Sequence, residues 1–270
     1  MSGATDCPGG RLERAAIAAA ALLLAGCATV PPDAGKNPRD PFERFNRQVY
    51  GFNDQFDRYV LKPAAKGYVA VVPHAFRLCI ANGVSNVGEI RNAVNDILQA
   101  KPVGASTDTG RLAINTTLGV FGCFDVATKM GLERRTEDFG LTLARWGAGP
   151  GPYLMLPVLG PSDVRDAVGL VPDSYTNPIT YVTPVYDRYI YYVGSAIETR
   201  AGLLDATDLI DRTALDRYQF TRDVYLQRRT SLQYEGNPPL SREPDDGDET
   251  GSRPSGTKTN PAQPAPEDRR

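Results

Sequence analysis

The sequence predicts a mainly α-helical domain, and three observations carry this prediction. Apolar side chains recur at spacings of three and four over long stretches, which is the spacing of one face of a helix. Alternation with a period of two is scarce, and the short segment LTLARW (141–146) is the best strand candidate. Proline and small polar residues stand where several of the helical stretches would begin.

The first helix is expected in the segment DPFERFNRQVYGFNDQFDRYV (40–60). Asp40 is the predicted N-cap, Pro41 would take the first helical position, and Glu43 completes a capping-box pattern. An apolar stripe follows, and two interpretations of it stay open: a face turned to a protein core, or an aromatic face lying in a membrane interface. The stripe consists of Phe42, Phe45, Val49, Phe52, Phe56 and Tyr59.

Two more helical patterns and a glycine-bounded segment follow. One pattern runs from Pro73 to Leu98, and two glycines at 83 and 88 are candidate points at which it would split into two helices. The next helix begins near Ser106. The segment 121–140 is bounded and interrupted by glycines, which is the composition of a helical hairpin or flap whose ends can bend.

The C-terminal half of the domain predicts a tyrosine-rich helix and a last helix over about 205–234. The tyrosine-rich helix starts at Thr183–Pro184 and is apolar almost all round. Tyrosines of this kind either contact lipid headgroups or lie in a core where their phenols find polar partners, and both interpretations stay open.

The stretch RWGAGPGPYLMLPVLGPSDVRD (145–166) is rich in glycine and proline. It has neither a phosphate-loop ending nor a dinucleotide-binding fingerprint, and Pro150 and Pro152 remove N–H donors that a phosphate cradle would use. We therefore expect a stiff turn that delivers residues 153–160 into an apolar place, followed by a helix that Ser162 opens.

The N-terminus predicts an exported lipoprotein. Residues 1–26 have two arginines before a short apolar stretch, as in a secretory signal peptide. The sequence LAGC then places Cys27 at the position that is diacylated in bacterial lipoproteins, and Ala28 favours the outer membrane. The expected organisation is a signal peptide (1–26), a tether (27–39), a helical domain (40–235) and a disordered tail (236–270).

Several function classes lack the residues that they need. The formal net charge of −2 gives no basic field for nucleic acid, and no stretch after the signal is long and apolar enough for a conventional transmembrane helix. His74 is the one histidine, and no nucleophile elbow is present. We therefore predict no enzyme activity, no catalytic residue, no cofactor and no metal. Cys79 and Cys123 could pair in an oxidising periplasm or remain free thiols.

The chain resembles the MlaA (VacJ) family of outer-membrane lipoproteins. The resemblance covers about residues 40–229, nearly the whole predicted domain, with its motifs in family order. The matching stretches are DPFERFNRQVYGFN, DRYVLKPAAKGY, VPHAFRLCIANGVSNVGEIRNAVNDILQ, INTTLGVFGCFDVATKMGL, EDFGLTLARWGAGPGPYLMLPVLGPSDVRD and ETRAGLLDATDLIDRTALDRYQFTRDVYLQRR.

The resemblance implies an all-α, ring-shaped domain embedded in the inner, periplasmic leaflet of the outer membrane, with a central amphipathic channel for phospholipid. It implies removal of phospholipid from the outer leaflet, transfer to the periplasmic carrier MlaC, and a trimeric porin as neighbour. The hairpin over 118–140 would border and gate the channel. Its candidate residues are Leu118, Gly119, Phe121, Gly122, Phe124, Asp125, Gly131 and Gly140.

The candidate channel-lining residues follow from motif position alone. They are Asn115, Thr116, Arg145, Asp163 and Arg165 on the polar side, and Tyr153 and Leu154, together with Phe121 and Phe124, on the apolar side. Because the resemblance assigns no role to Cys79 and Cys123, we expect both thiols to be free; a bond between them would tie the hairpin to an earlier helix. Two rival functions are a structural or adhesive lipoprotein that docks on porins or peptidoglycan, and a lipid hydrolase, which the missing nucleophile elbow disfavours.

Overall fold

The computed structural model describes residue 31 and residues 34–239. The predicted signal peptide, Cys27 and most of the predicted tail lie outside the described residues. In chain order the elements are α2 (Glu43–Phe56), η1 (Asp57–Leu61), α3 (Lys62–Val71), α4 (His74–Leu98), α5 (Pro102–Thr117), α6 (Val126–Lys129), α7 (Phe139–Arg145), β1 (Tyr153–Leu156), β2 (Gly160–Asp163), α8 (Val164–Thr176), η2 (Pro178–Tyr181), α9 (Val185–Gly202), α10 (Leu204–Thr213) and α11 (Arg217–Gln233).

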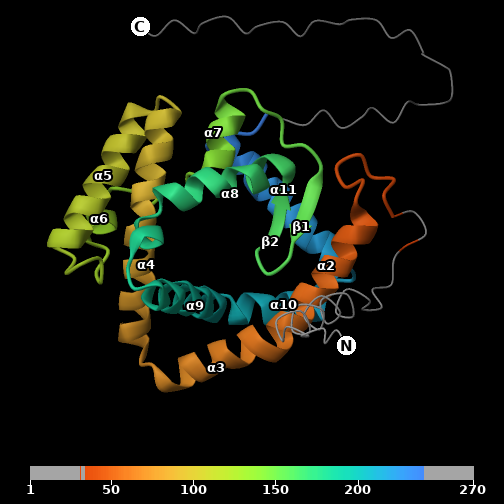
Figure 1. The fold of residues 1–270 in the computed structure, drawn as a ribbon, viewed down its shortest axis with the longest axis horizontal. Coiled ribbons are helices and arrows are strands. Elements are labelled where there is room, and N and C mark those ends of the chain that lie inside the picture. Colours follow the sequence, from red (N-terminus) through yellow and green to blue (C-terminus); the bar gives the residue numbers. More distant parts are fainter. Residues whose placement is uncertain (1–30, 32–33, 240–270) are drawn as a thin grey trace, which may run out of the picture.

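The helices are arranged as a ring (Figure 1). In this view α8 and α9 form two opposite sides, α4 closes the ring on the left, and the β1–β2 hairpin and α11 close it on the right. The α5–α6 segment lies outside the ring against α4, and α3 runs beneath α9. The predicted all-α class is confirmed, with one two-stranded sheet in the described part of the chain.

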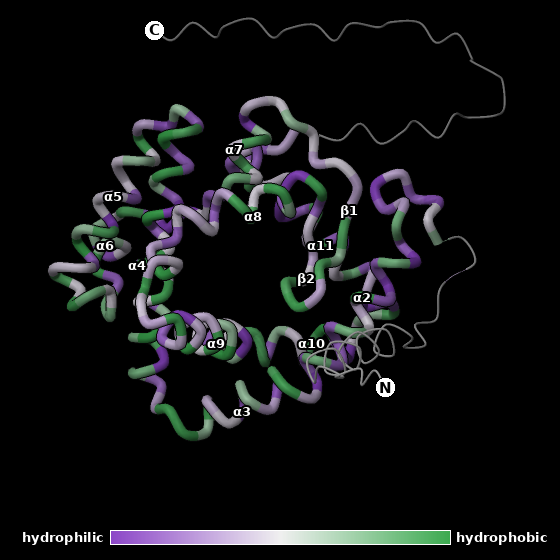
Figure 2. The backbone as a smooth tube through the Cα atoms, in the orientation of Figure 1, coloured by the Kyte–Doolittle hydropathy of each residue, from purple (hydrophilic) through white to green (hydrophobic). Residues whose placement is uncertain are grey.

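Helix α4 buries polar side chains and exposes apolar ones, the reverse of the usual arrangement in a soluble protein. The buried face of α4 is made of Asn86, Glu89, Asn92, Asn95 and Asp96. By contrast, apolar side chains of the same helix such as Phe76 and Ile97 are 65% and 67% exposed. In the described residues, buried polar and charged side chains outnumber buried apolar ones. Figure 2 accordingly shows hydrophobic positions spread along the helices of the ring rather than gathered at one centre.

Helix α2 resolves the open question about its aromatic stripe. Its buried residues are Glu43, Asn46, Arg47 and Val49, whereas Phe42 and Phe45 are each about half exposed. The stripe is therefore divided: Val49 faces the small apolar core, whereas Phe42 and Phe45 do not. The expected capping box is also wrong: the helix begins at Glu43 without a side-chain cap, because Asp40 accepts hydrogen bonds from distant partners instead.

Other expected boundaries need correction. Helix α4 is continuous despite its two glycines, and the LTLARW segment belongs to helix α7 because Asp138 caps it by accepting from the Leu141 N–H (2.9 Å). The last helix is divided into α10 and α11, since Asp216 caps a new helix start at Arg217. The tyrosine-rich helix α9 has no buried residue, so it is not a core helix.

The glycine- and proline-rich stretch forms an antiparallel hairpin rather than a simple turn. Strand β1 pairs with β2 in a register that sets Tyr153 opposite Asp163. Asn46 holds β1 to α2: its side chain donates to the Tyr153 carbonyl (3.1 Å) and accepts from the Met155 N–H (2.9 Å). Helix α8 is opened by Asp163, not Ser162, because the Asp163 carboxylate accepts from the Asp166 N–H (2.8 Å).

A small apolar core anchors this hairpin to α2 and α11. Tyr153 is fully buried and packs edge-on against Tyr218 and Tyr225, with ring centroids 6.3 and 5.8 Å away. Val49 and Met155 complete the cluster. The segment 153–156 thus enters an apolar place, as expected. Within residue 31 and residues 34–239, no helix is long and apolar enough to cross a membrane.

Candidate functional site: the polar frame of the ring and its hairpin

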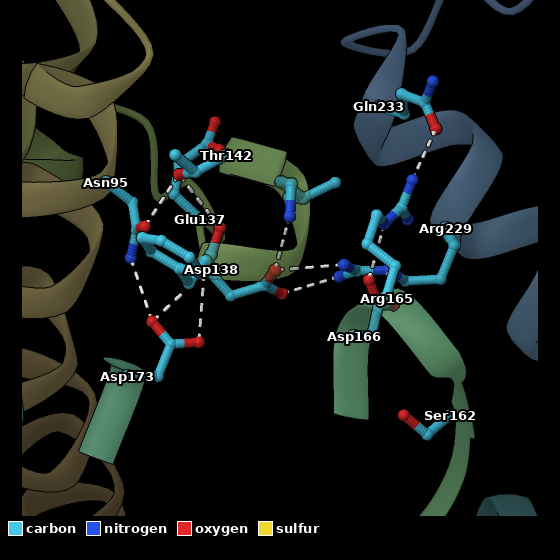
Figure 3. A network of polar contacts seen from close by, with 12 residues as sticks. Asn95, Glu137, Asp138, Thr142, Ser162, Arg165, Asp166, Asp173, Arg229 and Gln233 are labelled. Carbon is cyan, nitrogen blue, oxygen red and sulfur yellow. Dashed lines mark hydrogen bonds and ion pairs between the residues drawn. The ribbon is translucent and has the colours of Figure 1, made fainter. Parts of the chain in front are cut away.

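A partly buried ionic cluster centred on Arg229 joins α7, α8 and α11 (Figure 3). The Arg229 guanidinium donates to both carboxylate oxygens of Asp138 (2.6 and 3.0 Å), and its Nε lies 2.5 Å from Asp166. Burial opposes the charge of this guanidinium, but the bonds to Asp138 raise the pKa of Arg229 above its usual value. Because Asp138 also caps α7, one cluster fixes the start of that helix and its place against α11.

A second set of polar contacts joins α4, α7 and α8 (Figure 3). The Asp173 carboxylate accepts from the Phe139 N–H (3.0 Å) and from the Asn95 side chain (3.1 Å). Thr142 in turn donates to the Asn95 side-chain oxygen (2.7 Å). Helices α7 and α8 approach closely here, since a Cβ on Gly169 would lie 2.7 Å from the Gly140 nitrogen. This part of the ring is therefore held by polar contacts across three helices.

The α5–α6 hairpin is built on a fully buried arginine. Arg111 donates through Nε to Glu89 of α4 (2.8 Å) and through Nη1 to Thr128 of α6 (2.9 Å), and its Nη2 lies 3.3 Å from Asp125. Burial opposes ionisation of Asp125, but hydrogen bonds from Thr128 hold the pKa of Asp125 below its usual range. Asn115, at 3% exposed, accepts from the Ala127 N–H (2.9 Å).

The tip of the hairpin is exposed and apolar. Phe121 is 84% exposed and Phe124 is 57% exposed. Backbone geometry depends on the glycines: Gly122 has a φ of +86°, and a Cβ there would lie 2.7 Å from the Cβ of Asn86. At Gly119 a Cβ would collide with the carbonyl oxygens of Phe124 and Asn115.

The prediction of free thiols is wrong, because Cys79 and Cys123 form a disulfide. The two cysteines face each other where the segment after α5 packs on the first half of α4. The side chain of Asn82 also donates to the Cys123 carbonyl (3.0 Å), and Asn86 donates to the Thr116 hydroxyl (2.9 Å). The hairpin is consequently tied to α4 by one covalent bond and several hydrogen bonds.

The structure separates the candidate lining residues into two groups. Tyr153, Asp163 and Arg165 are 0%, 1% and 5% exposed. Tyr153 belongs to the apolar core. Asp163 and Arg165 belong to the polar frame, by which we mean the polar contacts around Arg229, Asn95 and Arg111. Arg165 donates to Asp166 (3.1 Å), and burial raises the pKa of Asp163 to about 6. The hairpin residues Asn115 and Thr116 lie together beside α4, whereas the other candidates are spread over the chain: Arg145 is exposed at the end of α7 and Leu154 is half-buried in β1.

Sequence reasoning did not single out four ionisable residues of this frame: Glu89, Asp108, Arg111 and Arg229. For Glu89, Asp108 and Arg111 the sequence does contain a pattern that could have identified them. Polar residues recur at spacings of three and four on α4 and α5, a polar stripe where an ordinary soluble helix would carry its apolar one. Arg229 has no comparable local signal because its partners lie in distant elements.

A buried pair of carboxyl groups lies between α4 and α5. Asp96 and Asp108 are both fully buried, and none of their four oxygens has a hydrogen-bond partner in the described part of the chain. Burial, together with the neighbouring charge of Asp96, raises the pKa of Asp108 to about 7. Arg135 lies 3.5 Å from Asp96 and partly offsets its charge. Among the described residues, no group of three or more potential metal ligands comes together.

Together these features define a class of protein: a helical ring with a polar internal frame and exposed apolar side chains on many of its helices. Extensive exposed apolar surface marks contact with a membrane or with another protein. The chain belongs to the MlaA lipoprotein family, whose model matches residues 38–232.

Individual relatives agree with this membership. The intermembrane phospholipid transport system lipoprotein MlaA of Escherichia coli K12 is 35% identical over 226 residues, which cover 81% of this chain and 87% of that protein. The Haemophilus influenzae protein of the same name is 32% identical over 228 residues, 80% of this chain and 87% of that one. An uncharacterized protein of Rickettsia typhi is 38% identical over 201 residues, covering 73% and 80%.

A solved structure shares the fold. It is described as the structural basis for maintenance of bacterial outer membrane lipid asymmetry, and it superposes with a TM-score of 0.63 at 36% identity. The match covers 73% of this chain and 99% of that chain. The family resemblance that the motifs predicted is therefore confirmed, as is the helical fold.

Proposed function

We propose that this chain is the outer-membrane lipoprotein of an intermembrane phospholipid transport system. In this role it removes phospholipid from the outer leaflet and passes it to a periplasmic carrier of the MlaC type, so that the asymmetry of the outer membrane is maintained. The names of the Escherichia coli and Haemophilus influenzae relatives support the assignment. It involves no catalytic step.

The inverted polarity of the ring is the observation that carries the proposal. A protein surrounded by lipid gains little from an apolar core, because its apolar side chains are already out of water. Its polar side chains must instead satisfy one another inside. The buried polar face of α4 and the exposed aromatic side chains of α2 and α9 fit this arrangement.

The position in the membrane follows from the same surface. We place the ring in the inner, periplasmic leaflet, held by acyl chains on Cys27, with a trimeric porin as a neighbour on its apolar side. Tyr186 and Tyr189 of α9, 63% and 62% exposed, would lie at headgroup level, where tyrosine is favoured.

The hairpin supplies the gate in this proposal. Its exposed tip carries Phe121 and Phe124, which would contact acyl chains. At its base the half-buried Thr116 would stand on the polar side of the path, and the buried Asn115 would support it. The contacts of Arg111 fix the base, and the Cys79–Cys123 bond ties the backbone of the tip to α4. Movement would therefore be confined to the Phe121 and Phe124 side chains and to the glycine-bounded end at Gly131 (φ +88°).

Purification in mild detergent tests this function against a purely adhesive role. We expect the full-length lipidated protein to carry phospholipid, and added carrier protein to withdraw it. A matched control is another outer-membrane lipoprotein of the same strain, purified in the same detergent. Phospholipid no more abundant than in that control would contradict the proposal.

A further inference from the structure

A cavity of about 240 Å³ lies beside the β1–β2 hairpin. Residues of α2, η1, the β1–β2 hairpin, α9, α10 and α11 line it. Its wall is mixed: Met155, Pro161 and Ile210 are apolar, and five charged side chains of both signs complete it, namely Asp54, Asp57, Asp211, Arg200 and Arg217. The proposed phospholipid path passes through the ring that these elements close.

All five charged side chains of the cavity wall form ion pairs, but the pair of Arg200 is shorter than those of Arg217. Arg200 is 11% exposed and donates to both carboxylate oxygens of Asp57, through Nε (2.5 Å) and Nη2 (2.8 Å). Arg217 by contrast binds Asp54 at longer distances, through Nη1 (3.1 Å) and Nη2 (3.5 Å), and shares Nη1 with Asp211 (2.9 Å). The Asp54 and Asp211 side chains are 26% and 41% exposed, so a donor from solution can reach them.

The ion pairs around the cavity contain equal numbers of positive and negative side chains. Two cations outside the cavity wall complete it: Arg58 lies 3.4 Å from Asp54, and Lys62 lies 3.6 Å from Asp211 and 2.8 Å from Asp208. Four carboxylates (Asp54, Asp57, Asp208 and Asp211) thus face four cations (Arg58, Lys62, Arg200 and Arg217). A ligand with a net charge would leave that charge uncompensated in this partly enclosed site, whereas a zwitterion would not.

We propose that this cavity is a subsite for a zwitterionic phospholipid headgroup of the phosphoethanolamine type. Its phosphate binds the guanidinium of Arg217, because guanidinium groups form strong charge-assisted hydrogen bonds with phosphate. Its ammonium replaces Arg217 as donor to Asp54 and Asp211. The phosphate and ammonium thereby exchange one set of ion pairs for another, and the numbers of positive and negative groups stay equal. The inference rests on the proposed transport function and adds to it a preference among phospholipids.

Lipid selection by the full-length, lipidated protein tests the subsite. The protein is incubated in mixed micelles that contain equal amounts of phosphatidylethanolamine and phosphatidylglycerol, and the bound lipids are quantified by mass spectrometry. The wild type should enrich phosphatidylethanolamine. Asp54→Asn combined with Asp211→Asn should lower the bound ratio by up to about fivefold, the limit for a partly exposed ion pair, without lowering total bound lipid.

The matched control is Asp205→Asn, an exposed position of α10 that does not line the cavity, and it should keep the wild-type ratio. Circular dichroism checks folding, and Asp211→Asn alone, at the more exposed position, serves if the double variant unfolds. A wild type that binds both lipids equally, or a variant that keeps the wild-type ratio, overturns the subsite and leaves the transport function standing. A wild type that binds neither lipid overturns both.

Discussion

The Arg229 cluster offers the sharpest test of the polar frame. Replacing Arg229 with methionine keeps much of the side-chain volume but leaves Asp138 and Asp166 without their main partner. These side chains are 22% and 12% exposed, and that of Arg229 is 12% exposed. Breaking a buried ion pair by removing one partner costs about 3–5 kcal/mol. Since water reaches part of this cluster, we expect a loss of about 3 kcal/mol in the free energy of unfolding.

The assay is equilibrium denaturation in detergent, followed by circular dichroism, for the wild type, Arg229→Met, Asp138→Asn and the double variant. The two substitutions should be non-additive, because the double variant no longer contains the unpaired charge of Asp138. Arg228→Met, at the exposed neighbouring position, is the control and should change stability by less than about 0.5 kcal/mol. A loss below about 1 kcal/mol in Arg229→Met, or strict additivity, would refute the view that this cluster holds the ring.

Four further predictions test other parts of the structure. Because folding raises the pKa of Asp108 from 3.8 to about 7, its stabilising contribution is complete below pH 3.8 and is lost as the pH rises through about 7. Asp108→Asn should flatten this decline when unfolding is measured between pH 5 and 8, and an unchanged slope would contradict the raised pKa of Asp108. Replacing Cys79 and Cys123 together with serine opens a loop with a sequence separation of 44, which should cost about 4 kcal/mol, and faster hydrogen exchange confined to residues 118–125 is the expected sign. Gly169→Ala should destabilise the α7–α8 crossing by about 1–3 kcal/mol, because the added methyl group meets the backbone of Gly140; an unchanged melting temperature would show that the crossing adjusts without cost. Cys27→Ala should release the protein from the outer-membrane fraction, and normal fractionation would contradict the anchor.

The sequence predicted where helices lie better than it predicted which way they face. The spacing of Phe76, Ile80 and Val84 correctly indicated a helix, but the buried face of α4 is the one with Glu89 and Asn92. Periodicity locates an apolar stripe and does not say whether protein or lipid covers it. The aromatic stripe of α2 illustrates the same ambiguity, since both of its interpretations fit the spacing equally.

Long-range contacts account for the other differences. Asp40 satisfies every local rule for an N-cap, yet its carboxylate is used by Tyr218 and Arg222, more than 170 positions along the chain. The strand pair 153–156 and 160–163 depends on Asn46, which no local pattern connects to it. The motif-based candidates Tyr153 and Asp163 likewise mark buried positions, the first in the apolar core and the second in the polar frame.

Outer-leaflet phospholipid in living cells tests the central claim most directly. A strain lacking this gene is labelled with a membrane-impermeant amine reagent, and labelled phosphatidylethanolamine is compared with that of the parent and of the complemented strain. We expect surface phospholipid to rise in the deletion strain and to return to the parental level when the wild-type gene is restored. Surface phospholipid that is the same in the deletion and parental strains would contradict the assignment to phospholipid transport.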